Sequence, residues 1–309
     1  MTDRPRVLPS GEQFELTHGR QRAVVTEVGG GLRSYTSDGA DILDGYGAGE
    51  MCRGGRGQVL VPWPNRLGGG RYRFGGSDLQ LPINEPERHN AIHGLVRWTA
   101  WQAGEQEEAR LVMRHLLHPQ PGYPFTLDLA VEYQLSPGGL TVTTTATNRG
   151  SSPLPFGAGF HPYLTVGTAA VDESFLALPA RTGLETDAGG IPTGTELAVE
   201  GSPYDFRHRR QVGASRLDTC FTGLEPDGDG VARVALSTGD GSRRVTLWAD
   251  GSFTYLMVFT GDTLEPDRRR RSIAVEPMTC APDAFRNGRG LRVLEPDESV
   301  VLRWGLQPG

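Results

Sequence analysis

Apolar and polar residues alternate with a period of two through most of the chain from Phe14 onward. In residues 127–135, Leu, Val and Tyr alternate with mainly polar residues, a pattern that predicts a strand with one buried face. A turn at 136–139 leads into the Thr- and Val-rich segment 140–147. These two segments therefore predict a β-hairpin.

A second hairpin is predicted from residues 244–249 and 253–260, which flank the turn-forming pair Asp250 and Gly251. Residues 105–114 come nearest to a helical pattern, but their apolar positions also alternate, so we expect a strand there as well. Further strands are expected at 23–26, 110–116, 231–237, 272–276 and 299–304.

The chain contains no clean amphipathic helix of 12 or more residues. Its 43 glycines and 22 prolines interrupt apolar strands that persist throughout, which indicates many turns rather than disorder. No Ser/Gly-rich linker and no fixed-period repeat divides it. We therefore predict an all-β protein: one large antiparallel β-sandwich over residues 12–309, preceded by a flexible tail at 1–11.

Composition and charge exclude several classes of function. All 31 basic residues are arginine, and the absence of lysine excludes Schiff-base chemistry, a pyridoxal phosphate lysine and a P-loop lysine. The net charge of -6 gives no electrostatic reason to expect a nucleic-acid partner. The three cysteines are odd in number and lack metal-binding spacing, which indicates free thiols in a reducing compartment.

The chain shows no stretch of 18 apolar residues and no signal-peptide core near its first residue. We therefore expect no membrane partner, a cytoplasmic location, and a monomer or weak homodimer.

Two stretches of similar design carry the candidate catalytic residues. In the stretch from Phe156 to Tyr163, two glycines precede His161 and a proline follows it. In residues 273–277, an apolar run leads to Glu276, and we expect the proline after it to end the strand. We interpret the two as an acid–base pair at the ends of different strands. A buried core histidine and a surface glutamate are the structural alternative.

The loop at 62–70 offers Trp63, Asn65 and Arg66 within four residues. An amide and a guanidinium hydrogen-bond hydroxyl groups, and an indole stacks on the C–H face of a sugar, so this loop suits a polyhydroxylated ligand. A structural loop whose Arg66 makes a surface ion pair is the alternative.

His89 and His93 are four residues apart, but zinc binding of the H-E-x-x-H type needs a helix and a glutamate after the first histidine. Asn90 stands there and Gly94 follows His93, so we expect no metal. His93 is better read as a polar binding residue or a packed core histidine. Asp218, between apolar neighbours, could bind hydroxyls or cap a turn.

Taken together, these motifs resemble the aldose 1-epimerase (galactose mutarotase) family from about Phe14 to Leu306. The matching positions are Asn65-Arg66 with Arg71 to Phe74, Asn84-Glu85, His93-Gly94, Gly159 to Tyr163, Leu217-Asp218, Val275 to Pro277 and Pro282 to Phe285. The chain departs from the best-known members at the rigid Pro62-Trp63-Pro64 and at Leu95, which follows Gly94. In these features it resembles a less characterised bacterial branch of the family.

The resemblance implies a galactose mutarotase-like supersandwich with a shallow sugar site and no cofactor. It also implies Glu276 as general base and His161 as general acid, with Asn65, Arg66, His93 and Asp218 binding the sugar. The reaction would be interconversion of the α and β anomers of an aldose by ring opening and closure. We expect attraction between the pair to help keep the histidine charged.

Three alternatives remain. The substrate could be a hexose 6-phosphate, clamped by arginines such as Arg71, Arg97 or the run 268–271; net charge and the 62–70 loop favour neutral monosaccharides instead. The protein could be a non-catalytic sugar-binding module, for which an acid–base pair is unnecessary. A glycosidase using Glu276 and Asp218 would leave His161 without a role.

Overall fold

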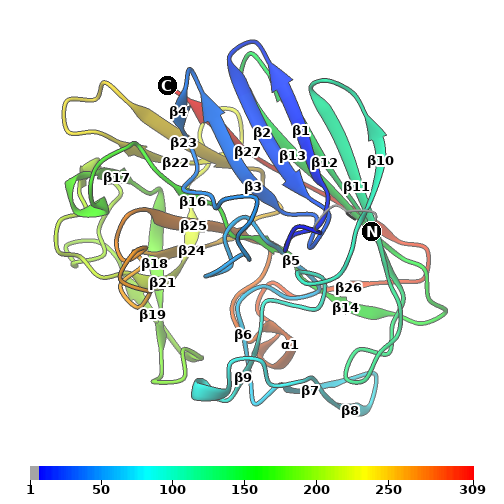
Figure 1. Ribbon diagram of the computed structural model, residues 1–309. Coiled ribbons are helices and arrows are strands. Elements are labelled where there is room, and N and C mark those ends of the chain that lie inside the picture. Colours follow the sequence, from blue (N-terminus) through cyan, green and yellow to red (C-terminus); the bar gives the residue numbers. More distant parts are fainter. Residues whose placement is uncertain (1–6) are drawn as a thin grey trace.

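A computed structural model describes residues 7–309 (Figure 1). Two large antiparallel sheets dominate it. The nine-stranded sheet has the order β10 (Gln102–Gln106), β11 (Arg110–Leu117), β12 (Leu127–Ser136), β13 (Gly139–Asn148), β27 (Ser299–Pro308), β23 (Arg244–Ala249), β22 (Ala232–Ser237), β17 (Phe175–Ala177), β20 (Arg210–Gln211). The eight-stranded sheet has the order β19 (Pro192–Ala198), β18 (Ala180–Thr186), β21 (Asp218–Leu224), β24 (Tyr255–Phe259), β25 (Ile273–Met278), β15 (Gly159–Phe160), β5 (Val59–Leu60), with β16 (Tyr163–Leu164) also on β25.

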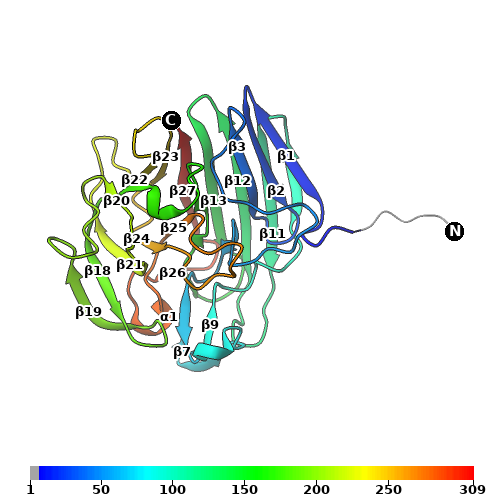
Figure 2. The same cartoon turned by 60° about the vertical axis from the view of Figure 1, so that its left-hand side comes forward.

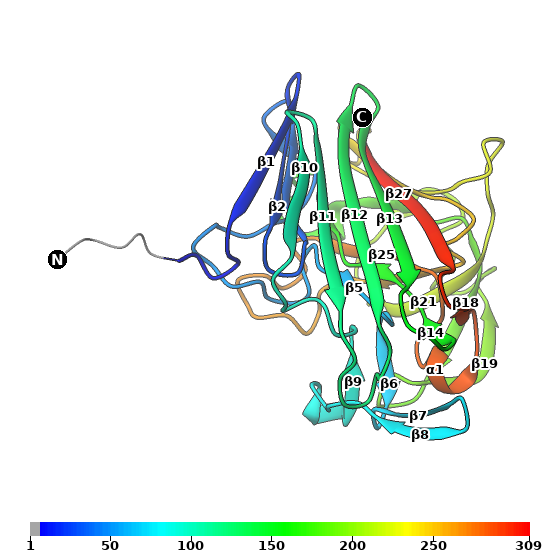
Figure 3. The same cartoon turned by 90° about the vertical axis from the view of Figure 1, so that its right-hand side faces the viewer.

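Smaller elements surround these sheets. A four-stranded sheet, whose first strand β1 lies against β11 and β12 (Figure 3), contains β1 (Gln13–His18), β2 (Gln21–Thr26), β3 (Leu32–Ser37) and β4 (Ala40–Asp41). Three two-stranded ribbons pair β14 (Leu154–Phe156) with β26 (Arg292–Leu294), β6 (Arg66–Gly68) with β9 (Asn90–Ile92), and β7 (Arg71–Phe74) with β8 (Ser77–Gln80). The short helices are η1 (Pro86–Arg88), η2 (Val171–Glu173) and α1 (Ala284–Asn287).

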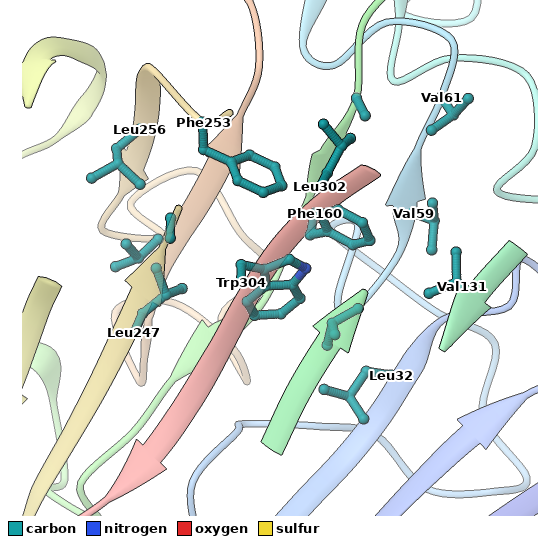
Figure 4. Packing of buried hydrophobic residues seen from close by; sticks show 14 of the residues in the cluster. Leu32, Val59, Val61, Val131, Phe160, Leu247, Phe253, Leu256, Leu302 and Trp304 are labelled. Carbon is teal, nitrogen blue, oxygen red and sulfur yellow. The ribbon is translucent and has the colours of Figure 1, made fainter. Parts of the chain in front are cut away.

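The main core lies between the two large sheets, which Figure 2 shows with β18, β21 and β24 on one side and β11 to β13 on the other. Phe160 of the eight-stranded sheet packs on Trp304 of the nine-stranded sheet, with 5.1 Å between ring centroids (Figure 4). Because side chains alternate along a strand, a residue next to one that faces this core can face outward. Phe160 points into the core, and His161 comes directly after it.

The predicted all-β antiparallel fold is confirmed, and so is the first hairpin: Leu127 to Ser136 pair in register with Asn148 to Gly139. The second predicted hairpin is wrong. β23 pairs with β22 and β27, whereas β24 pairs with β21 and β25 in the other sheet. Phe253 explains the difference, because its side chain is buried in the core where the chain crosses between the sheets.

Of the tail predicted at 1–11, residues 1–6 lie outside the described residues, and Gly11 closes a turn by donating its N–H to the carbonyl of Leu8 at 3.0 Å. The cysteines at 52, 220 and 280 are buried free thiols. Within residues 7–309, no helix has the length and apolar character needed to cross a membrane.

Candidate active site

A cleft of about 510 Å³ opens on the outer face of the eight-stranded sheet. Its floor includes Glu276 of the central strand β25 and His161 from the segment beside it. The six residues proposed from the sequence come together among its lining: Asn65, Arg66, His93, Asp218, His161 and Glu276.

An interruption in strand pairing places His161 over the cleft. β15 and β16 both pair with β25, and His161 and Pro162 form the break between them. The backbone of His161 turns away from β25: its N–H donates to the carbonyl of Gln58 at 3.2 Å, and its carbonyl accepts from the N–H of Gly57 at 2.8 Å. The side chain is left facing Glu276, with 3.3 Å between Nε2 and Oε1.

Glu276 lies inside a strand rather than at its end, which corrects the sequence prediction that Pro277 stops the strand. β25 continues to Met278, and Pro277 pairs with Leu256 of β24. The N–H groups of residues 275 and 279 point toward β15 and β16, where they donate to the carbonyls of Pro162 and Ala158, respectively. By alternation, the missing N–H of Pro277 faces the break at His161, where a ladder hydrogen bond is not needed.

Both members of the pair are almost completely buried. Burial, with smaller contributions from the charges of Arg56 and Arg97, lowers the pKa of His161 to about 3. Burial also raises the pKa of Glu276 well above its ordinary value, and the nearby charge of Asp218 adds to the rise. The sequence-based expectation that attraction keeps His161 charged is thus opposed by desolvation, which favours a neutral pair sharing one proton.

Aromatic contacts fix the ring of His161. The ring of Tyr163 stacks on it at 5.0 Å with an interplanar angle of 14°, and His93 meets it edge-on at 5.3 Å. The guanidinium of Arg56 lies 4.2 Å from the centre of the Tyr163 ring. Gly55 closes over His161: at φ +77°, an added Cβ would lie 2.6 Å from the imidazole, so glycine alone fits there.

Asn65 and His93 face each other just beyond the β6–β9 ribbon, both in the left-handed region with φ 55° and 64°. The backbone N–H of Asn65 donates to Nδ1 of His93 at 3.3 Å, and the N–H of His93 donates to the Asn65 carbonyl at 2.9 Å. Burial lowers the pKa of His93, so its ring is neutral. With Nδ1 accepting, the proton is on Nε2, which becomes a hydrogen-bond donor.

Glu85 holds Arg66 in place. Nε of Arg66 lies 3.1 and 3.0 Å from the two carboxylate oxygens of Glu85, which also accepts from Asn90 Nδ2 at 2.8 Å. This ion pair is largely buried, not a surface pair, and it uses Nε while leaving the terminal nitrogens for other acceptors. Glu85 was not among the predicted site residues, although Asn84-Glu85 was one of the matching motifs.

Asp218 is the first residue of β21 and lies at the rim, with 42 % of its side chain exposed and Oδ2 3.7 Å from Nη1 of Arg88. Its outward position suits contact with an exposed part of a ligand.

The predicted indole is the wrong tryptophan. Trp63 is 3 % exposed and packs on Phe285 in the core, 5.6 Å between ring centroids. The cleft is instead lined by Trp98, which is 47 % exposed. Pro62 and Pro64 direct the loop backbone, but alternation and burial decide which side chain reaches solvent, and the sequence carried no clear signal for Trp98.

Within the part of the chain described, no group of three or more His, Cys, Asp or Glu side chains is arranged to hold a metal ion. The groups that converge in the cleft are hydrogen-bond donors and acceptors around a buried acid–base pair.

Comparison with known proteins identifies the family. Residues 12–306 match the model of the family described as aldose 1-epimerase, and the chain belongs to this family. The uncharacterized protein YihR of Escherichia coli K12 is 34% identical over 287 residues, which cover 93% of this chain and 90% of YihR. Mouse galactose mutarotase is 29% identical over 181 residues, covering 55% of this chain and 50% of that protein.

A solved structure shows the same fold. The GalM/aldose epimerase homologue of C. elegans superimposes with a TM-score of 0.86 at 16% identity, over 96% of this chain and 98% of the other. The predicted resemblance to the aldose 1-epimerase family and the galactose mutarotase-like fold are thereby confirmed.

Proposed function

We propose that the protein interconverts the α and β anomers of an aldose without a cofactor, with Glu276 as general base and His161 as general acid. The observation that carries this proposal is the 3.3 Å contact between His161 Nε2 and Glu276 Oε1 at the floor of a cleft lined by hydrogen-bonding groups. An acid and a base in contact, each able to reach one ligand, are what ring opening requires.

The chemistry balances with one proton on the pair. The Glu276 carboxylate takes the proton of the anomeric hydroxyl while His161 donates a proton to the ring oxygen. The bond between C1 and the ring oxygen breaks and C1 becomes a carbonyl. Rotation about C1–C2 presents the opposite carbonyl face, and the ring closes as both proton transfers reverse. Because burial moves the pKa of each group toward its neutral form, the proton of the free pair lies on Glu276. It passes across the 3.3 Å contact to Nε2 of His161 before the ring opens, which leaves the carboxylate as base and the imidazolium as acid.

The remaining groups support binding of the sugar. The terminal nitrogens of Arg66 and the Nε2–H of His93 are donors for ring hydroxyls, and Asp218 is an acceptor at the rim. The exposed indole of Trp98 offers a face on which sugar C–H groups stack. Asn65 acts through its backbone contacts with His93, which set the tautomer of that ring.

A phosphate clamp formed by several arginines lacks support. Arg71 lines a different groove, beside Tyr72 and Phe285. In the run 268–271, Arg268 is paired with Asp44 and Glu50, and Arg270 is paired with Asp172 and Asp262. A non-catalytic binding module would gain nothing from burying two titratable groups, since their desolvation costs stability.

Polarimetry or NMR with a panel of free and phosphorylated aldoses tests the proposal. We expect the purified protein to accelerate equilibration of at least one anomerically pure aldose far beyond the rate in buffer. Failure with every aldose that it binds would leave the sugar-binding module as the better account.

A further inference from the structure

Arg97 is a cation in the cleft that the proposed mechanism does not use. Three arginines line the cleft: Arg66, Arg88 and Arg97. Arg66 is paired with Glu85, and Arg88 lies 3.7 Å from Asp218. Among residues 7–309, no carboxylate lies within 4.0 Å of the Arg97 guanidinium, and its buried Nε has no hydrogen-bond acceptor.

The surroundings of Arg97 make this lack of a partner costly. Its neighbours in the cleft include Cys52 and Trp98, and its guanidinium lies 5.6 Å from the centre of the Trp98 ring. Burial lowers the pKa of Arg97, and the residue is close enough to the catalytic pair to lower the pKa of His161 too. A half-buried guanidinium without an anion is destabilised, and a negatively charged ligand would remove that cost.

We propose that Arg97 binds an anionic substituent of the sugar, so that the preferred substrate is an aldose carrying a singly charged group such as a carboxylate. This inference rests on the proposed epimerase function and specifies its substrate class. One unpaired guanidinium balances one negative charge. A phosphate dianion would remain undercompensated in a cleft that also contains the carboxyl groups of Glu85, Glu87 and Asp218.

A charged substrate differs from the neutral sugars expected from the sequence. That preference used the net charge of the whole chain, which is -6. Recognition depends instead on the charges nearest the ligand, because exposed charges more than about 10 Å away are largely screened at 0.1 M salt. Arg97 is a local charge, and the sequence did not reveal that it lacks a partner.

The test compares matched ligands by calorimetric titration at neutral pH: D-glucuronate and D-galacturonate, their uncharged uronamides, and the 6-phosphates of the parent hexoses. The uronamide keeps the shape of the uronate and removes its charge. We expect the wild-type protein to bind at least one uronate ten or more times more tightly than its amide and than the 6-phosphate. Equal or weaker binding of both uronates would overturn the inference, with no variant needed.

Arg97→Gln should then weaken uronate binding by about 10- to 100-fold and change amide binding by less than about threefold, as expected for loss of a charged hydrogen-bond partner. Arg71→Gln, in the separate groove, should leave both unchanged. Unaltered uronate affinity in folded Arg97→Gln would also overturn the inference. If the protein mutarotates neutral hexoses but does not prefer uronates, the role of Arg97 is refuted and the epimerase function stands. If it binds uronates through Arg97 but mutarotates no aldose, the epimerase function is refuted instead.

Discussion

Nε2 of His161 lies 3.3 Å from Oε1 of Glu276, although the two residues belong to segments far apart in the chain. The second polar atom of each group, His161 Nδ1 and Glu276 Oε2, is buried without a hydrogen-bond partner in residues 7–309. Buried polar atoms are normally satisfied in folded proteins, so a pair left partly unsatisfied is typical of a functional site rather than of a stabilising contact.

The pair predicts an unusual pH profile. Burial raises the pKa of Glu276 and lowers that of His161 to about 3, so the pair does not take up a second proton until the pH is far below 6.5. We expect kcat/KM for mutarotation to stay level through pH 6.5 and to fall on the acid side well below it. An acid limb centred near pH 6.5, the ordinary value for histidine, would contradict the burial of His161 in the working protein.

Glu276→Gln should stabilise the fold at pH 7. The folded carboxyl holds its proton above the ordinary pKa of 4.5, whereas the unfolded chain releases it. Wild-type stability therefore falls as pH rises above 4.5, a loss that glutamine does not share. We expect a gain of at least about 1 kcal/mol at pH 7 that shrinks toward pH 4.5, measured by denaturant unfolding. Glu87→Gln, at an exposed position, is the control. An equal gain in stability in Glu87→Gln, or no gain in Glu276→Gln, would argue against a raised pKa of Glu276.

The two tryptophans near the site predict opposite phenotypes. Trp63→Ala empties a core position and should cost about 3–5 kcal/mol of stability. Trp98→Ala removes an exposed indole and should leave the melting temperature nearly unchanged while raising KM several-fold. Thermal unfolding and steady-state kinetics on both variants separate the roles. An unchanged KM in Trp98→Ala would remove the indole from the binding site.

Arg66→Lys tests the geometry set by Glu85. A lysine ammonium lacks the planar fork that lets Nε contact Glu85 while the terminal nitrogens remain free. We expect the substitution to weaken sugar binding by about 1.5–3 kcal/mol, seen mainly as a higher KM. Arg71→Lys, an exposed position hydrogen-bonded to Gln80, is the matched control. Equal kinetics for the two variants would show that Arg66 does not contact the substrate.

The sequence was most informative where chemistry and local geometry coincide. Alternation predicted the strands, and motifs with a distinctive residue order selected His161, Glu276, Asn65 and Arg66, which the structure brings into one cleft. It was least informative where a property depends on the whole fold. Whether Glu276 is buried depends on the neighbours of β25, and the crossing at Phe253 reflects a choice between two sheets that no local turn signal reveals.

Residues that support the site from outside the predicted set also depend on the whole fold. Arg56 contacts Tyr163, and Tyr163 contacts His161, yet nothing in the spacing of Arg56 indicates this stack. Trp98 and Arg97 line the cleft because the segment after His93 passes beside it, a matter of chain path rather than residue type. Contacts between segments remote in sequence need the structure.

The most direct test of the central claim is the mutarotation rate of the wild-type protein beside Glu276→Gln and His161→Asn, with binding of the same aldose measured by calorimetry. A positioned acid or base typically contributes about 10²–10⁴ in rate, whereas one altered hydrogen bond changes affinity by about 1 kcal/mol. We predict rapid equilibration by the wild type, and folded variants that still bind the sugar but equilibrate its anomers little faster than buffer. Near-wild-type turnover in either variant would contradict the assigned pair.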